Sequence, residues 1–180
     1  MDKVNISEKV FEKIVILFEN YKSSLSTYTS DQFNFKATED VWSLAEMYEH
    51  VCMSAKKFFL ANTRRCMEQR NGQLGGEKNA AGENVFKYGG FPPMKFKVPG
   101  GPEAANISGR DKSVYFQEIE EILESARQMI NPLESDAGVY KTLHPVLGWL
   151  NAMEWFQNLE MHTRHHLTQK AELENLAKHG

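Results

Sequence analysis

Apolar side chains recur at three- and four-residue steps in four segments of the chain, and this spacing is typical of helices that bury one face. The four segments cover residues of about 5–25, 41–68, 111–131 and 145–177. Ser43 can cap the second helix, Pro132 is expected to end the third, and Pro145 suits the first turn of the fourth. With no strong strand pattern beside them, these helices predict an all-α fold, a four-helix bundle, in a single domain over residues 1–180.

The connection between the second and third predicted helices, about residues 70–108, has a different composition. Residues 70–109 hold nine of the 12 glycines and four of the six prolines, so a helix cannot continue through them. A connection of this length is unusual inside a compact domain. We interpret it either as a crossover between the two ends of the bundle or as a lid over a site at one end. Within it, residues 85–88 and 94–98 are expected to form short extended pieces or hydrophobic anchors.

The charge and the cysteines narrow the expected environment. The formal net charge is -3, and no basic field indicates nucleic acid or an anionic membrane as a partner. No apolar run approaches the roughly 20 residues that cross a bilayer, and the first residues do not resemble a secretory leader. Cys52 and Cys66 are a poor disulfide framework and are expected to be small buried residues. We expect a cytoplasmic protein that acts on a small-molecule substrate.

The last predicted helix places polar side chains on its buried stripe. Alternating steps of four and three residues define the stripe as Gly148, Ala152, Trp155, Leu159, His162, His166, Gln169, Leu173 and Leu176. Burying a neutral imidazole without a partner costs about 1–3 kcal/mol, so something should satisfy these histidines. His162 and His166 are one turn apart and project toward a common point, as helical metal ligands do. His165 lies near the same face and is an alternative to His166.

A third ligand has to come from another helix. His179 lies beside the C-terminus, and His144 lies about five turns before His162, which is too far to share a metal ion. By elimination the third ligand is His50, in the second predicted helix. Three imidazoles leave one coordination position open, as in catalytic zinc sites. Glu46, one turn before His50, is a candidate catalytic residue that could accept an imidazole N–H or move protons.

The same residues have interpretations without a metal. His50 alone is more typical of a half-buried surface histidine, and Glu46 is more typical of a solvated helix residue. Trp42, Trp149 and Trp155 are first of all candidates for the core or an interface. A further hypothesis uses Trp149, Trp155 and the Phe-rich first helix as the walls of a pocket for a small apolar molecule.

Two blocks of the sequence resemble a known family. The block Trp42-Ser43-x-x-Glu46-x-x-x-His50 resembles the start of the second helix in DinB/YfiT-like proteins. The block His162-x-x-His165-His166-x-x-Gln169 resembles the last-helix signature of the same family. The resemblance implies a four-helix bundle that holds a divalent metal, zinc or nickel, through three histidines. Carried over to this chain, these are His50, His162 and His166.

The resemblance also implies a class of chemistry. Several characterised relatives are transferases or isomerases that use a low-molecular-weight thiol such as mycothiol, bacillithiol or glutathione, and homodimers are common. Our leading hypothesis is therefore a metalloenzyme with Zn2+ or Ni2+ and a thiol or water at the open position. The alternative is a non-catalytic metal-binding or stress-associated interaction module. The long connection departs from the family pattern and is expected to shape the mouth of the pocket.

Overall fold

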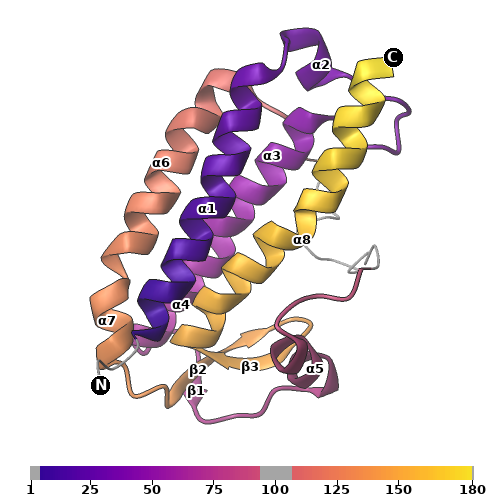
Figure 1. The fold of residues 1–180 in the computed structure, drawn as a ribbon. Helices are drawn as coiled ribbons and strands as arrows, with labels where there is room; N and C mark the ends of the chain where they lie inside the picture. The colour runs from indigo at the N-terminus through magenta and orange to yellow at the C-terminus, as the bar shows by residue number, and fades with distance from the viewer. Residues whose placement is uncertain (1–4, 94–106, 180) are drawn as a thin grey trace.

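The computed structural model describes residues 5–93 and 107–179, and it is mostly helical (Figure 1). The long helical elements are α1 (Ile6–Thr27), α3 (Leu44–Met53), η1 (Ser54–Leu60), α4 (Ala61–Met67), α6 (Lys112–Gln128) and α8 (Ala152–His179). The short elements are α2 (Ser30–Asn34), α5 (Ala80–Tyr88), α7 (Ile130–Ser135), β1 (Gln73–Leu74), β2 (Tyr140–His144) and β3 (Gly148–Asn151). No helix within the described ranges is long and apolar enough to cross a bilayer.

Side-chain caps determine where the long helices begin. The Ser43 hydroxyl accepts the N–H of Glu46 at 3.1 Å, and the Glu46 carboxylate accepts the N–H of Ser43 at 2.8 Å. This reciprocal pair satisfies two backbone donors at the start of α3. Asn5 caps α1 and Asp111 caps α6 in the simpler, one-sided way. The predicted cap at Ser43 is confirmed.

The second predicted helix is continuous from Leu44 to Met67 but widens in its middle. Its first part, α3, leads into the π-helical stretch η1, which leads into α4. A π-helix carries more residues per turn, and here the neighbours Phe58 and Phe59 both contact α8. The Phe58 ring lies 5.1 Å from the Trp155 ring, and the Phe59 ring lies 6.3 Å from it.

Aromatic rings fix α3 in the middle of the protein. α1 packs against both α6 and α8, and α3 contacts the same two helices (Figure 1). The Tyr48 ring of α3 meets Tyr21 of α1 and Phe33 of α2 edge to face, with ring centroids 5.5 Å apart in both pairs. Such pairs contribute about 0.5–1.5 kcal/mol each beyond their buried area. The position of α3 is therefore set by specific ring contacts.

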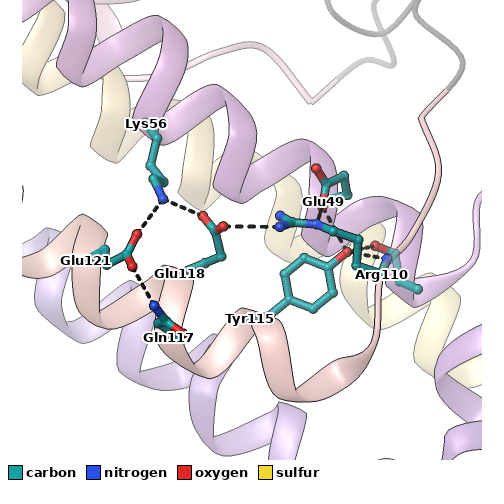
Figure 2. Close-up of polar contacts among 8 residues, drawn as sticks. Glu49, Lys56, Arg110, Tyr115, Gln117, Glu118 and Glu121 are labelled. Atoms are coloured by element: carbon teal, nitrogen blue, oxygen red, sulfur yellow. Dashed lines mark hydrogen bonds and ion pairs between the residues drawn. The ribbon is translucent and has the colours of Figure 1, made fainter.

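Charged side chains join α3 and η1 to α6 (Figure 2). Arg110 binds Glu49 at 2.7 Å and Glu118 at 3.2 Å, and Lys56 binds the other oxygen of Glu118 at 2.8 Å. Glu118 thereby bridges two cations that come from different parts of the chain. The Tyr115 hydroxyl lies 3.0 Å from the Glu49 carboxylate, which it can reach as a donor. The network sets the position of α3 along α6.

A β-hairpin stands where the sequence predicted the beginning of the last helix. β2 pairs with β3 in an antiparallel register from Lys141↔Asn151 to His144↔Gly148, and β1 adds a third strand next to β2. Pro145 lies in the hairpin turn, and α8 begins only at Ala152. The all-α prediction is therefore wrong here, because Pro145 fits the second position of a β-turn as well as the first turn of a helix.

The predicted end of the third helix is also wrong. α6 ends at Gln128, and the short helix α7 follows from Ile130. Pro132 lies in the first turn of α7 and does not end a helix. A first-turn position has no intrahelical partner for its N–H, so proline costs little there.

The Gly/Pro-rich connection contains regular structure, in contrast to the irregular segment predicted for residues 70–108. Helix α5 begins after its cap Asn79 and ends at Gly89, whose φ of 66° is left-handed and suits glycine. The run 85–88 is helical, with Val85 buried. The run 94–98 lies outside the described residues, so the choice between crossover and lid stays a prediction.

Close backbone contacts hold the segment before α5 against the hairpin. The Trp149 N–H donates to the Glu77 carbonyl oxygen at 3.1 Å, and the Asn79 N–H donates to the Leu147 carbonyl oxygen at 3.0 Å. Gly148 lies between them with a φ of 84°, and a Cβ atom there would come within 2.7 Å of the Asn79 nitrogen. Only glycine allows this approach.

Candidate metal centre

Three histidines from two distant helices converge on one point. His50 comes from α3, and His162 and His166 come from successive turns of α8. The three Nε2 atoms form a nearly regular triangle: His50 to His162 is 3.3 Å, His50 to His166 is 3.1 Å, and His162 to His166 is 3.2 Å. We call these residues the triad. The structure brings together the three histidines that the sequence selected, with His166 and not His165 as the third member.

Hydrogen bonding alone cannot explain this triangle. A neutral imidazole nitrogen carries either one proton or one lone pair, and an imidazolium nitrogen carries only a proton. A single N–H shared between two acceptors satisfies at most two of the three contacts, and the two acceptors then face each other with their lone pairs. A cation between the three Nε2 atoms would use all three lone pairs at once.

The spacing of the nitrogens fits a divalent metal. Imidazole nitrogens lie about 2.0–2.1 Å from zinc, which places them about 2.9–3.4 Å apart for bond angles between 90° and the tetrahedral angle. The measured separations of 3.1–3.3 Å fall in this range. The triad therefore has the donor type, number and spacing of a three-histidine metal site.

Burial keeps the triad neutral, which is the form that binds a metal. Removal from water lowers the pKa of His50 to about 3 and that of His166 to about 4, and His166 adds to the effect on His50. Burial, followed by the nearby histidines His166 and His50, lowers the pKa of His162 well below its ordinary value. At neutral pH all three rings therefore present lone pairs and no positive charge.

Gln169 fixes the ring of His166. The Nδ1 atom of His166 lies 2.8 Å from Oε1 of Gln169, three residues further along α8. An amide oxygen only accepts, so Nδ1 carries the proton and Nε2 carries the lone pair. Gln169 was part of the predicted inward stripe, and the structure assigns it this hydrogen bond.

Two aromatic side chains pack against the other two histidine rings. The Trp42 ring lies 5.1 Å from the ring of His50, and the Phe59 ring lies 4.8 Å from the ring of His162. The sequence placed Trp42 in the core or at an interface and gave no role to Phe59. The position of Trp42 directly before the cap of α3 was the one sequence feature that indicated its contact with His50. The contact of Phe59 with His162 depends on the π-helical turn of η1.

Residues after α5 approach α8 beside the triad. Arg164 donates to the Gly89 carbonyl oxygen at 2.6 Å, and the Phe91 ring lies 5.8 Å from the ring of His165. His165 thus faces Phe91 and stands outside the triad. Part of the Gly/Pro-rich connection is therefore fixed next to the candidate site.

Glu46 makes the contacts of a helix cap. Its carboxylate accepts from the Ser43 N–H and from the Lys36 ammonium, whose nitrogen lies 2.8 and 2.9 Å from its two oxygens. Nδ1 of His50 has no hydrogen-bond partner in the part of the chain that the structure describes, so the expected contact from Glu46 is not formed. A catalytic role for Glu46 stays a prediction.

The remaining histidines lie elsewhere, as the sequence indicated. His144 accepts the N–H groups of Val146 and Leu147 through Nδ1, at 3.1 Å each, and so caps the hairpin turn. His179 contacts the Asn175 carbonyl oxygen at the end of α8. Neither joins the triad. Cys52 and Cys66 are both buried and free, as expected.

Comparison with protein families agrees with this geometry. The family model described as the DinB superfamily matches residues 17–169, a range that contains the whole triad. The chain belongs to the DinB superfamily. None of the curated proteins compared with it matches the chain. The DinB superfamily is metal-binding, and the triad is a group of three histidines whose ring nitrogens could hold a metal ion.

Proposed function

We propose that this DinB superfamily protein is a divalent-metal-dependent enzyme in which His50, His162 and His166 hold the metal. The observation that carries the proposal is the triangle of three Nε2 atoms 3.1–3.3 Å apart, which hydrogen bonds cannot satisfy and a cation can. Zn2+ and Ni2+ both accept imidazole ligands at this spacing.

The residues of the chain hold the three ligand rings in position, keep them neutral and bury them. Gln169 holds His166 in the tautomer that ligates through Nε2, and Trp42 and Phe59 restrict the rings of His50 and His162. Because all three ligands are neutral, they leave the double positive charge of a divalent ion undiminished. Such an ion acts as a Lewis acid that lowers the pKa of a water molecule or thiol, which makes either a nucleophile near neutral pH.

Transfer or isomerisation with a low-molecular-weight thiol is the reaction class that we propose. Three protein ligands leave a position for the thiol or for water, as in catalytic rather than structural sites. Phe91 and His165, next to the triad, are candidates for contact with a small-molecule substrate. We also propose Glu46 as a proton carrier. This role requires its carboxylate to leave the cap at Ser43. A homodimer belongs to the same proposal, and light scattering tests it.

Metal analysis of four proteins tests the site. Purified wild-type protein, loaded with Zn2+ or Ni2+ and dialysed, is expected to retain about one ion per chain, whereas His162→Ala and His166→Ala lose it. His165→Ala is the matched control, because His165 neighbours the triad without joining it, and it is expected to retain the ion. A wild type that takes up neither metal, or a His165→Ala loss equal to that of His166→Ala, contradicts the proposal.

A screen of thiols with the loaded protein separates the enzyme from a non-catalytic module. We expect turnover of an electrophilic or isomerisable substrate with one thiol, and no turnover with His162→Ala. Metal-dependent thermal stability without turnover of any thiol would favour the module, since a structural metal stabilises the fold and needs no open position.

A further inference from the structure

Several buried polar atoms, on triad histidines or on residues one helical turn from them in sequence, have no hydrogen-bond partner in the described part of the protein. They are Nδ1 of His50, Nδ1 of His162, the hydroxyl of Ser54 and both amide atoms of Asn158. Ser54 is 2% exposed and Asn158 is 0% exposed, so bulk water does not satisfy them. An unpaired buried polar group costs about 1–3 kcal/mol. A concentration of such groups around one site calls for a role.

The unpaired groups fall into two pairs with the same spacing. Ser54 is four residues after His50, and Asn158 is four residues before His162. Side chains four residues apart share a helix face, with Cβ atoms about 5–6 Å apart. The Ser54 N–H bonds to the His50 carbonyl oxygen, so the turn that joins them is α-helical and this spacing holds. Each unpaired ring nitrogen therefore has an unpaired oxygen one turn away.

His166, the third member of the triad, already has a hydrogen-bond partner for its Nδ1 atom. Its Nδ1–H already donates to Gln169, at a distance of 2.8 Å. A histidine that ligates through Nε2 carries its proton on Nδ1, where it needs an acceptor. The oxygens of Asn158 and Ser54 are acceptors, so two unpaired donors and two unpaired acceptors are each separated by one helical turn.

We propose that Asn158 and Ser54 are positioning residues of the metal site, which accept the Nδ1–H groups of His162 and His50 when the triad holds a divalent cation. The inference rests on the proposed metal site and adds two residues that act through the ligands. With Gln169, each member of the triad then has one oxygen partner on its own helix.

Zinc affinity and metal-free stability, measured together, test this role. Asn158→Leu removes both amide atoms at similar volume, and Ser54→Ala removes the hydroxyl. We expect the Zn2+ dissociation constant, from competition with a chromophoric chelator, to rise about 10- to 100-fold in Asn158→Leu and in the same direction in Ser54→Ala. The metal-free Asn158→Leu protein is expected to unfold at the same or higher urea concentration than wild type, because an unpaired buried group is gone.

Two variants of α8 control the comparison. Thr163→Val removes an unpaired buried hydroxyl next to His162 in sequence but on another side of the helix, and its zinc affinity is expected to equal that of wild type. Asn158→Asp retains an acceptor and is expected to keep wild-type affinity, although a buried carboxylate weakens the metal-free fold. In zinc-loaded wild type, the His162 Nδ1 proton is expected downfield in the NMR spectrum and upfield of that position in Asn158→Leu.

The outcomes separate the inference from the proposed function. A wild type that does not bind Zn2+ overturns the proposed metal site. A wild type that binds Zn2+, with Asn158→Leu and Ser54→Ala affinities within twofold of it, overturns only the positioning role. Equal losses in Asn158→Leu and Thr163→Val also overturn it, since they would indicate a general packing effect. If Asn158→Leu does not fold, Ser54→Ala decides the question by the same measurement, and an affinity within twofold of wild type overturns the positioning role.

Discussion

His144, which is not a member of the triad, couples folding to pH through a single side chain. Burial lowers its pKa to about 4 in the folded protein, from an ordinary value of 6.5. Above pH 6.5 the ring is neutral in the folded and the unfolded chain, so it adds no pH dependence. Between pH 6.5 and about 4 only the unfolded chain takes up the proton. The free energy of unfolding therefore falls by about 1.4 kcal/mol per pH unit, or about 3 kcal/mol in total.

His144→Asn is expected to flatten this pH dependence. The asparagine side-chain oxygen can accept the N–H groups of Val146 and Leu147 in place of Nδ1, and it does not titrate. Urea unfolding of the metal-free proteins at several pH values between 4.5 and 7.5 checks the prediction. The triad is present in both proteins, so the difference in slope reports the loss of His144, including its electrostatic effect on His162. Identical slopes would contradict the assignment.

At the scale of residues, the spacing of the histidines along the chain was the main basis for predicting the candidate site. His162 and His166 are one helical turn apart, and this geometry holds wherever α8 begins, so their convergence was predictable. His50 followed by elimination among the remaining histidines. The side chains that pack against the histidine rings were harder to predict, because Phe59 contacts His162 from within the π-helical stretch η1. No local pattern in the sequence predicted that widening.

At the scale of elements, the errors lie where two structures share the same signals. Pro145 suited both a helix start and a hairpin turn. The deciding signal was further along: Asn151 and Glu154 form a reciprocal capping box, with N–H to carboxamide or carboxylate contacts of 2.9 Å in both directions. Within the Gly/Pro-rich connection, the cap Asn79 and the terminal Gly89 mark α5 in the same way. The average composition of these segments does not indicate where α8 begins or where α5 begins and ends.

Gly148→Ala is expected to loosen the attachment of the segment before α5 to the hairpin. The substitution forces a left-handed φ on alanine and brings its Cβ within 2.8 Å of the Glu77 carbonyl oxygen. We expect a loss of about 2 kcal/mol or more in the free energy of unfolding, from urea titration, because strain and a backbone clash add. Limited proteolysis is expected to cleave residues 77–93 faster than in wild type.

Gly75→Ala separates strain from the clash. Gly75 has a similar φ of 73°, but a Cβ there meets nothing within 4 Å. Its expected cost is about 1 kcal/mol, with little change in the proteolysis of residues 77–93. Equal effects of the two substitutions would show that the close approach at Gly148 does not hold this segment.

At the scale of the whole molecule, the triad joins two helices that are far apart in sequence. A metal bound by His50 from α3 and by two histidines from α8 stabilises the folded state over the unfolded chain. Free Zn2+ at 1,000 times the dissociation constant is expected to add about 4 kcal/mol to the free energy of unfolding. Thermal melts with Zn2+ or with a chelator measure the shift, which His166→Ala is expected to abolish. An equal shift in that variant would place the metal elsewhere.

The order in which the chain is made has a consequence for this site. His50 is 112 residues ahead of His162 and 116 ahead of His166. During synthesis the growing chain therefore carries a single ligand of the triad until its final helix has left the ribosome. One imidazole holds a divalent ion weakly, so the nascent chain cannot collect the metal as it emerges. We therefore expect the triad to take up a divalent ion only after α8 has been synthesised and has docked against α3.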